Sequence, residues 1–185
     1  MSGWQDASVF FLPPVREADE RWFRGLSATI GLHSDGYLFQ EKEKSLPGRW
    51  ANLDVGAQLI SRPAGSTLVI SYFSRDFYWD VAKAPDRWVG FCHVFAWACV
   101  ALSPFAAVAL DTISDDILRD VRIYEEPVAE VDGARLLNMS YALLYLGPEL
   151  NRAALEKSPP WGVYSHLLSN GGRVASSWQY DEFPE

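Results

Sequence analysis

The sequence predicts an α+β fold in which a mainly antiparallel sheet packs on a central apolar helix with flanking helices. Segments with strand periodicity and segments with helix periodicity follow each other in irregular order along the chain. Short turn signals, typical of hairpins, separate several of the strand-like segments. A doubly wound parallel sheet would require strands and helices to alternate regularly, so the irregular order favours the antiparallel arrangement.

Length and composition predict one domain that spans residues 1–185. A chain of 185 residues with 49% hydrophobic and 22% charged residues lies in the range of globular proteins. It is long enough to bury a hydrophobic core without a structural metal or a disulfide. The sequence shows neither an internal repeat nor a long linker, so we expect a single core.

Five elements are expected in the first part of the chain. Residues 7–12 form a β-type run that ends at Pro13 and Pro14. Residues 17–30 carry apolar side chains at helical spacing and acidic residues at their start, which predicts an amphipathic helix. Extended segments are expected at 37–43, 50–60 and 66–73, with turns at Pro47-Gly48 and at residues 62–65.

The apolar run within residues 86–103 gives the strongest helix signal. Asp86 follows Ala84-Pro85 and is expected to cap this helix. The remaining faces of the helix are apolar too, which predicts that it is covered on most sides at the centre of the domain. The residues expected to be mostly buried on it are Trp88, Phe91, Phe95 and Leu102.

The last part of the chain is expected to return to strands. Pro148 suits the first turn of a helix at 149–157, and Asn170-Gly171 is a tight-hairpin signal. The hairpin would join residues 163–168 to residues 173–178. Further strands are expected at 105–110, 122–124 and 136–146, and a short helix at 115–120.

Cysteine usage and the apolar runs predict a cytoplasmic protein. The N-terminal residues carry no basic segment followed by an apolar one, so we expect no secretion signal. The run at 88–102 is shorter than the roughly 20 residues that a membrane-spanning helix needs. Cys92 and Cys99, seven positions apart on one helix, would have Cα atoms about 10 Å apart, too far for a disulfide. Two free thiols indicate a reducing compartment.

Motifs for catalysis, cofactors and metals are absent from the sequence. His33, His93 and His166 show no metal-ligand spacing, and the chain has no G-x-S-x-G, G-x-G-x-x-G or P-loop motif. We interpret the neighbours Cys92 and His93 as a core thiol and a buried, hydrogen-bonded imidazole, because successive helical residues point in different directions. The sequence therefore predicts no catalytic residue, no cofactor and no metal site, and a protein that is not an enzyme.

The aromatic segment at residues 72–79 holds five aromatic side chains, and two interpretations compete. Alternate residues of a strand would place part of them in the core. The residues beyond a turn at 74–76 would instead serve as rigid anchors at a protein interface, beside an arginine, or in a lesser variant as a stacking pocket for a small ligand. The candidate anchors are Arg75, Phe77, Tyr78 and Trp79.

Negative charge is concentrated in residues 111–132, the acidic segment. The chain has a net charge of −8, and eight acids against Arg119 and Arg122 give this segment −6. That sign is unsuited to a protein that binds nucleic acid or a membrane surface, and it favours a basic protein partner. The alternatives are a solvated surface and a divalent-ion site, although the spacing of an EF-hand is missing. The candidate partner-binding residues are Asp111, Asp115, Asp116, Asp120, Glu125 and Glu126.

The C-terminal third resembles the end of several bacterial polymorphic-toxin immunity proteins. The resemblance lies in Tyr141-Ala-Leu-Leu-Tyr-Leu-Gly-Pro-Glu-Leu150, a short helix, and Ser169-Asn-Gly-Gly-Arg-Val174 before a closing strand. It covers about a quarter of the chain and transfers no functional residue. It implies a small acidic cytoplasmic protein that binds and blocks a basic toxin domain.

The first functional hypothesis is therefore a non-enzymatic binding protein, an immunity protein that occludes the basic active site of a cognate toxin. A second hypothesis is a small hydrolase or ligand-binding domain that uses the aromatic segment as a pocket. A third is a structural or adaptor subunit. Neighbouring genes discriminate between them, since a toxin or secretion gene favours the first and an operon of metabolic enzymes favours the second.

Overall fold

One antiparallel sheet, whose strands are not in sequence order, dominates the structure. The structure is a computed structural model that describes residues 5–15, 19–33, 45–62, 65–109, 141–157 and 165–176. Within these ranges eight strands pair in the order β2-β3-β4-β1-β5-β6-β8-β7, and every neighbouring pair is antiparallel. The predicted α+β class and the antiparallel sheet are thus confirmed. The strands are β1 (Gln5–Leu12), β2 (Ser45–Trp50), β3 (Leu53–Arg62), β4 (Gly65–Phe73), β5 (Ala106–Ala109), β6 (Leu143–Leu146), β7 (Ser165–Leu167) and β8 (Arg173–Ser176).

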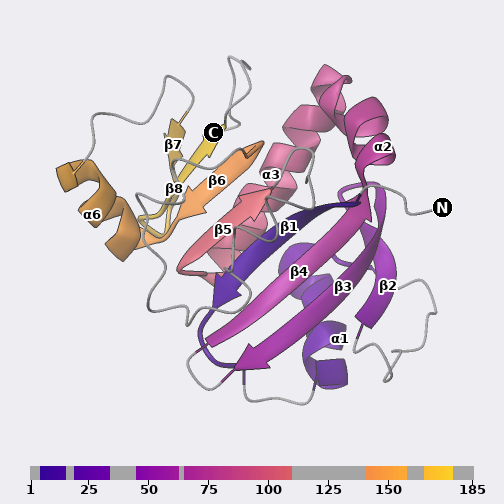
Figure 1. Cartoon of the computed structure of the whole chain (residues 1–185), viewed down its shortest axis with the longest axis horizontal. Helices are drawn as coiled ribbons and strands as arrows, with labels where there is room; N and C mark the ends of the chain where they lie inside the picture. The colour runs from indigo at the N-terminus through magenta and orange to yellow at the C-terminus, as the bar shows by residue number, and fades with distance from the viewer. Residues whose placement is uncertain are drawn as a thin grey trace.

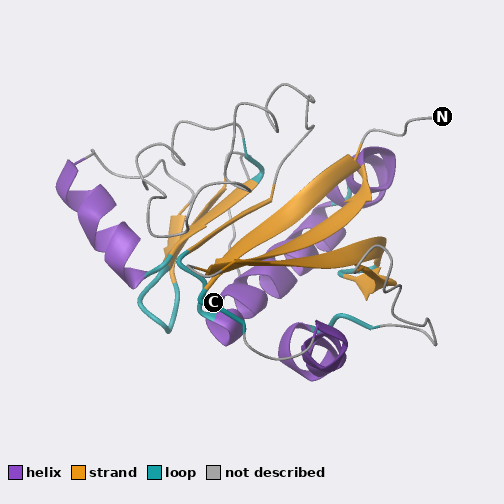
Figure 2. Ribbon diagram, turned by 60° about the horizontal axis from the view of Figure 1, so that its bottom comes forward, coloured by secondary structure: helices purple, strands orange, loops and turns teal. Residues whose placement is uncertain are grey.

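Two helices, α1 (Asp19–Ile30) and α3 (Pro85–Leu102), cover the same face of the sheet (Figures 1 and 2). The short turn α2 (Ser74–Asp76) and the π-helical turn η1 (Phe77–Ala82) lead from β4 into α3. A further helix, α6 (Pro148–Lys157), follows β6 and lies beside the β7–β8 end of the sheet (Figure 1). In the described ranges no helix is long and apolar enough to cross a membrane.

The central strands are buried on both faces, which explains their nearly continuous apolar sequences. In β1, the side chains on both faces of the strand are buried. Phe10 and Leu12 belong to the core under the helices, whereas Val9 and Phe11 are buried on the opposite face of the sheet. All residues of β5 and β6 are buried as well. A strand that is covered on both faces loses the alternating pattern of a half-exposed strand.

The turn predicted at Pro47-Gly48 is wrong, because both residues lie inside strand β2. The reversal comes later, at Ala51 and Asn52, where both residues have positive φ angles (50° and 65°) and Trp50 pairs with Leu53. Proline is tolerated in β2 because this strand is at the edge of the sheet, where its outer side meets no further named strand among the described residues and pairs only with His33, at Arg49. The hairpin lacks the glycine that usually marks such a turn, so residue types alone did not indicate its position.

Helix α3 confirms the predicted central helix but differs at its start and on one face. Ala84 is the N-cap, with Pro85 in the first turn, so Asp86 does not cap the helix as expected. Proline suits this position because its missing N–H is one of those that have no partner within the helix. Trp88, Phe91 and Phe95 are buried as predicted, while Leu102 is half-buried against the core.

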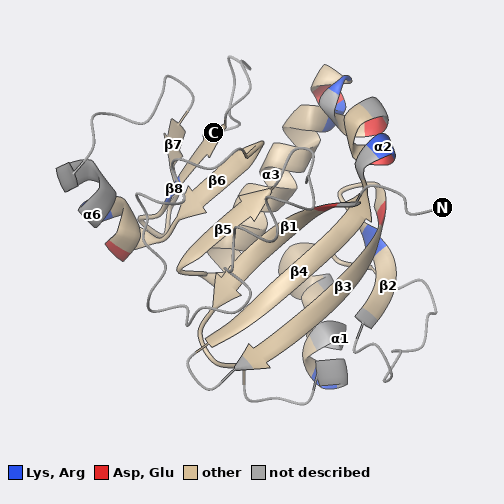
Figure 3. Ribbon diagram, viewed as in Figure 1, with Lys and Arg blue, Asp and Glu red and all other residues tan. Residues whose placement is uncertain are grey.

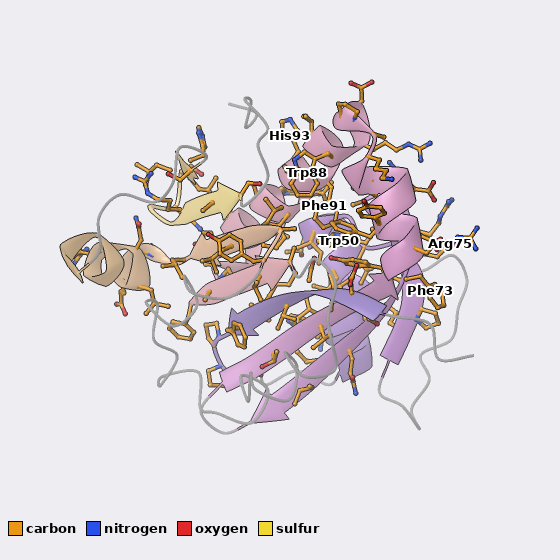
Figure 4. All side chains as sticks on the ribbon, turned by 45° about the horizontal axis from the view of Figure 1, so that its top comes forward. Trp50, Phe73, Arg75, Trp88, Phe91 and His93 are labelled. Atoms are coloured by element: carbon orange, nitrogen blue, oxygen red, sulfur yellow. The ribbon has the colours of Figure 1, made fainter. Side chains whose placement is uncertain are left out.

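The outer face of α3 is open, which corrects the expectation that the helix is covered on most sides. His93 is exposed rather than buried, and Trp97 keeps 47% of its surface exposed. Figure 4 shows His93 pointing away from the cluster formed by Trp50, Trp88 and Phe91. An apolar helix on the surface of a sheet therefore leaves one stripe of its side chains in contact with solvent.

Aromatic rings form a continuous line through the core between sheet and helix. The ring of Phe95 lies 5.5 Å from that of Phe10, which meets Trp50 edge-on at 6.1 Å. Trp50 in turn contacts Phe91 at 5.7 Å. Such edge-to-face contacts add to the burial of apolar area and fix how α3 sits on the sheet.

The extended segment expected at 50–60 is interrupted by the reversal at Ala51 and Asn52, and most other predicted elements are borne out where the structure describes them. The strand at 7–12, the helix ending at Ile30, the strand at 66–73 and the helix after Gly147 all match. The hairpin at Asn170-Gly171 is present too, with Gly171 at a φ of 82° and its N–H donating to the carbonyl of Leu168. The segments expected at 37–43, 115–120, 122–124 and 136–140 lie outside the described residues.

Both cysteines are free and buried in α3, and this environment predicts a loss of stability at alkaline pH. Burial raises the pKa of Cys92 to about 12 and that of Cys99 in the same direction. The folded chain therefore keeps these protons at a pH where the unfolded chain has lost them, so the free energy of unfolding falls between about pH 9 and about pH 12.

Urea titrations at about pH 8 and about pH 11 measure this fall. Replacing Cys92 by Ala should reduce the difference between the two titrations, because one of the buried thiols is then gone. An identical free energy of unfolding at both pH values would contradict the buried, protonated state of the thiols.

Candidate functional site

Four exposed aromatic and basic side chains come from the segment that leads from the end of β4 to the start of α3, and we call Phe73, Arg75, Tyr78 and Lys83 the aromatic corner. Phe73 and Tyr78 keep 53% and 50% of their surface exposed. Arg75 and Lys83 are exposed as well, and the Lys83 ammonium lies 4.6 Å from the centre of the Tyr78 ring. Figure 4 shows Phe73 and Arg75 at the edge of the molecule, away from the core. Exposed aromatic side chains and an arginine suit a protein interface.

The aromatic segment divides between core and surface, so both sequence interpretations hold for part of it. Phe77, one of the predicted anchors, is buried and packs on Tyr72 at 5.2 Å and on Phe91 at 5.0 Å. Its burial removes it from the candidate interface. Trp79 lies in η1, and its side chain is outside the described set.

Buried Phe77 gives the aromatic corner a rigid base. The π-helical turn η1 begins at Phe77, and the buried Val81 lies one turn further along. Tyr78 thus extends outward from a turn whose two neighbouring inward positions are anchored in the core. Turns of this kind are rare and often occur at functional sites.

Charged side chains of both signs surround the aromatic corner. Figure 3 shows them concentrated around α2, η1 and the start of α3, whereas most of the sheet is free of charge. Arg87 contacts Asp80 through an ion pair of 3.8 Å and donates a hydrogen bond to the Asp80 carbonyl at 3.1 Å. Both side chains are more than half exposed, so this pair orients the turn more than it stabilises it.

The acidic segment lies outside the described residues. Its six predicted partner-binding residues therefore have no described position relative to the aromatic corner. They are Asp111, Asp115, Asp116, Asp120, Glu125 and Glu126.

A second surface feature is a groove of about 420 Å³ between the end of α1, the β2–β3 turn and the open face of α3. Its volume falls in the range of small-molecule sites, roughly 300–1,000 Å³. Among the described residues, the lining combines aromatic, cationic and amide side chains and holds no carboxylate. The residues that line it are Gly31, His33, Arg49, Trp50, Ala51, Asn52, Val94 and Trp97.

Local backbone structure at the end of α1 builds one wall of this groove. Helix α1 ends at Ile30, whose carbonyl accepts a hydrogen bond of 3.0 Å from the indole Nε1 of Trp50. Gly31 then turns with a φ of 70°, and a Cβ atom there would come within 3.1 Å of the Trp97 ring. Two backbone hydrogen bonds, of 2.9 and 2.7 Å, pair His33 with Arg49 at the sheet edge.

The groove was not predicted, although α3 carried a signal for it. Trp88, Phe95 and Leu102 share one helical stripe, and Trp97 lies about 200° around the helix from Phe95. A bulky aromatic on the side opposite a complete core stripe marks a second contact surface. The sequence held no comparable indication for Arg49. Its place at the groove depends on the turn at Ala51 and Asn52, which was not predicted.

Other polar groups in the described core are structural in character. The Ser8 and Tyr72 hydroxyls lie 3.3 Å apart in the core, and burial raises the pKa of Tyr72 well above its usual value. Burial likewise raises the pKa of Tyr145 to about 12, and its hydroxyl accepts a hydrogen bond from Asn170 at 2.9 Å. Among the described residues, no three histidine, cysteine or carboxylate side chains gather as metal ligands would.

Comparison with known proteins finds no matching family model, no similar curated protein and no similar solved structure.

Proposed function

We propose that this chain is a non-enzymatic binding protein, an immunity protein that blocks a cognate bacterial toxin by covering its basic active site. The observation that carries the proposal is the aromatic corner, where Phe73 and Tyr78 are each about half exposed on a rigid base. A large apolar ring in water is unfavourable, and covering it with a partner recovers that free energy. Rigid support lowers the entropic cost of binding.

Charge supports a basic partner. The chain carries −8, of which the acidic segment contributes −6, so it attracts a basic protein over distance. Arg75 and Lys83 within the aromatic corner would pair with acidic groups at the rim of the contact. The aromatic side chains then provide affinity, while the acidic segment accelerates the encounter.

The test compares two variants on the partner that affinity capture from the native host identifies and that is then purified. A Phe73→Ser, Tyr78→Ser double variant should weaken binding by about 100-fold or more, since truncating hot-spot aromatics typically costs 2 kcal/mol or more each. The matched control is Leu167→Ser, an equally exposed apolar residue (55%) on the distant strand β7. It should leave the dissociation constant unchanged.

The acidic segment is tested through kinetics on the same partner. An Asp115→Asn, Asp116→Asn, Glu125→Gln triple variant should slow association at low salt and flatten its dependence on salt. The partner, expressed alone in bacteria, should stop growth, and co-expression of this chain should restore it. A captured partner that is not toxic would refute the proposal. So would a partner that binds the aromatic-corner double variant and the wild type with the same dissociation constant.

A further inference from the structure

The groove between α1, the β2–β3 turn and α3 has a composition that differs from the rest of this acidic chain. Its eight lining residues, all within the described ranges, include Arg49 and His33 and no aspartate or glutamate. In a chain with a net charge of −8, described lining residues that include the cation Arg49 and no acid favour an anion over a cation.

Trp97 supplies a flat surface for a ring. Its indole packs against the Cα position of Gly31, where any larger residue would push it away, and it still keeps 47% of its surface exposed. The ring is thus held in place on one side and open on the other. An exposed indole fixed in this way stacks well on another planar group.

Arg49 supplies the partner for a negative charge. Its Nε lies 3.3 Å from Oδ1 of Asp54, and the arginine side chain remains 60% exposed. Among the described residues this is the one ion pair of Arg49, and it engages Nε, so the two terminal nitrogens can face a second anion. A guanidinium edge binds a carboxylate or a phosphate through two parallel hydrogen bonds.

The hairpin turn between β2 and β3 places its polar tip at the groove. Gly31, Ala51 and Asn52 all have positive φ angles, and all three line the groove. Ala51 and Asn52 are the two central residues of the turn that follows the Trp50–Leu53 pair, and such a turn requires positive φ at both positions. The strand pairing therefore fixes where Asn52 lies relative to the groove.

We propose that this groove binds a small aromatic anion, with the ring of the ligand stacked on Trp97 and its carboxylate or phosphate on Arg49. The site is separate from the aromatic corner and does not depend on the immunity function. Asn52, exposed at the turn, provides an amide that can hydrogen-bond polar substituents of the ring.

Simple probe compounds test the two halves of this chemistry. Phenyl phosphate and phenylacetate carry both ring and anion, benzyl alcohol carries the ring alone, and inorganic phosphate carries the anion alone. Titrations followed by NMR of the Trp97 indole N–H should show saturable binding of phenyl phosphate or phenylacetate in the millimolar range, as expected for fragments. The stronger of the two identifies the anionic group. The single-feature probes should bind at least about tenfold more weakly.

Variants locate the binding. Arg49→Gln should reduce the affinity for the stronger anion to that for benzyl alcohol. Trp97→Leu lacks the indole signal and is followed through the backbone N–H of Gly31; it should remove the ring contribution. The matched control is Arg87→Gln, since Arg87 is equally exposed (60%) and is also paired with an aspartate. Arg87→Gln should leave the titration unchanged.

Three results would overturn the proposal. One is the absence of saturable binding of both anionic aromatics, and another is equal binding by wild type and Arg49→Gln. The third is an equal effect of Arg87→Gln, which would mean that the anion binds the surface through charge alone. Because Arg49 is exposed, its substitution keeps the test valid even where Trp97→Leu disturbs the fold. Failure of these titrations would not affect the partner-binding test at the aromatic corner.

Discussion

Replacing Phe95 by Ala is expected to lower the free energy of unfolding by about 3–5 kcal/mol, the usual cost of removing a large aromatic side chain from a core. Phe95 is completely buried in α3, and its ring lies 5.5 Å from that of Phe10 on the central strand β1. The substitution therefore leaves a cavity between the helix and the middle of the sheet, where the rigid strands restrict collapse. Denaturant titration with an unchanged slope measures the loss.

The control for this prediction is Phe105→Ala. Phe105 keeps 40% of its surface exposed just before β5, so its truncation should cost much less than that of Phe95. A loss below about 1 kcal/mol for Phe95→Ala would show that the helix does not pack at the centre of the core.

Replacing Gly172 by Ala is expected to destabilise the protein at the upper end of the roughly 1–3 kcal/mol that overpacking costs. A Cβ atom at this position would overlap the ring and the hydroxyl of Tyr145, which is completely buried in β6. The ring has little space to move. Displacing it would also disturb Asn170, which donates hydrogen bonds to the Tyr145 hydroxyl and, at 3.2 Å, to the Cys99 carbonyl.

The same substitution at Gly25 serves as the opposite control. Gly25 is exposed in α1, and a Cβ atom there would meet no other atom within 4 Å. Alanine should therefore stabilise the helix by about 0.5–1 kcal/mol, because glycine loses more backbone freedom on folding. If Gly172→Ala were as stable as wild type in thermal unfolding, the close packing of the β7–β8 hairpin on Tyr145 would be refuted.

Local patterns in the sequence were enough to predict the class of fold and most elements that the structure describes. The apolar run of α3, the proline at the start of α6 and the Asn170-Gly171 turn act through interactions among near neighbours. Such interactions depend on residue type and spacing, so they can be read without knowing what packs against them. The burial of Trp88, Phe91 and Phe95 followed from the same reasoning.

Only the tertiary structure decided how these elements meet and which side chains remain at the surface. By its sequence the aromatic segment suits either core or interface. The structure divides it, with Phe77 inward and Tyr78 outward, because η1 is a helical turn and not a strand. The exposure of His93 and Trp97 depends on where α1 lies beside α3. No neighbour in the sequence sets that position.

The groove shows most clearly the difference between what the sequence determines and what the tertiary structure decides. The sequence by itself determined its ingredients, a tryptophan on the far side of a core helix and an arginine near a strand end. Their meeting requires the turn at Ala51-Asn52, and its left-handed conformation is stabilised by the pairing of β2 with β3 and by Trp50 in the core. Strand pairing and the packing of Trp50 thus outweigh the local preference of alanine, and neither is apparent from the residue types at the turn itself.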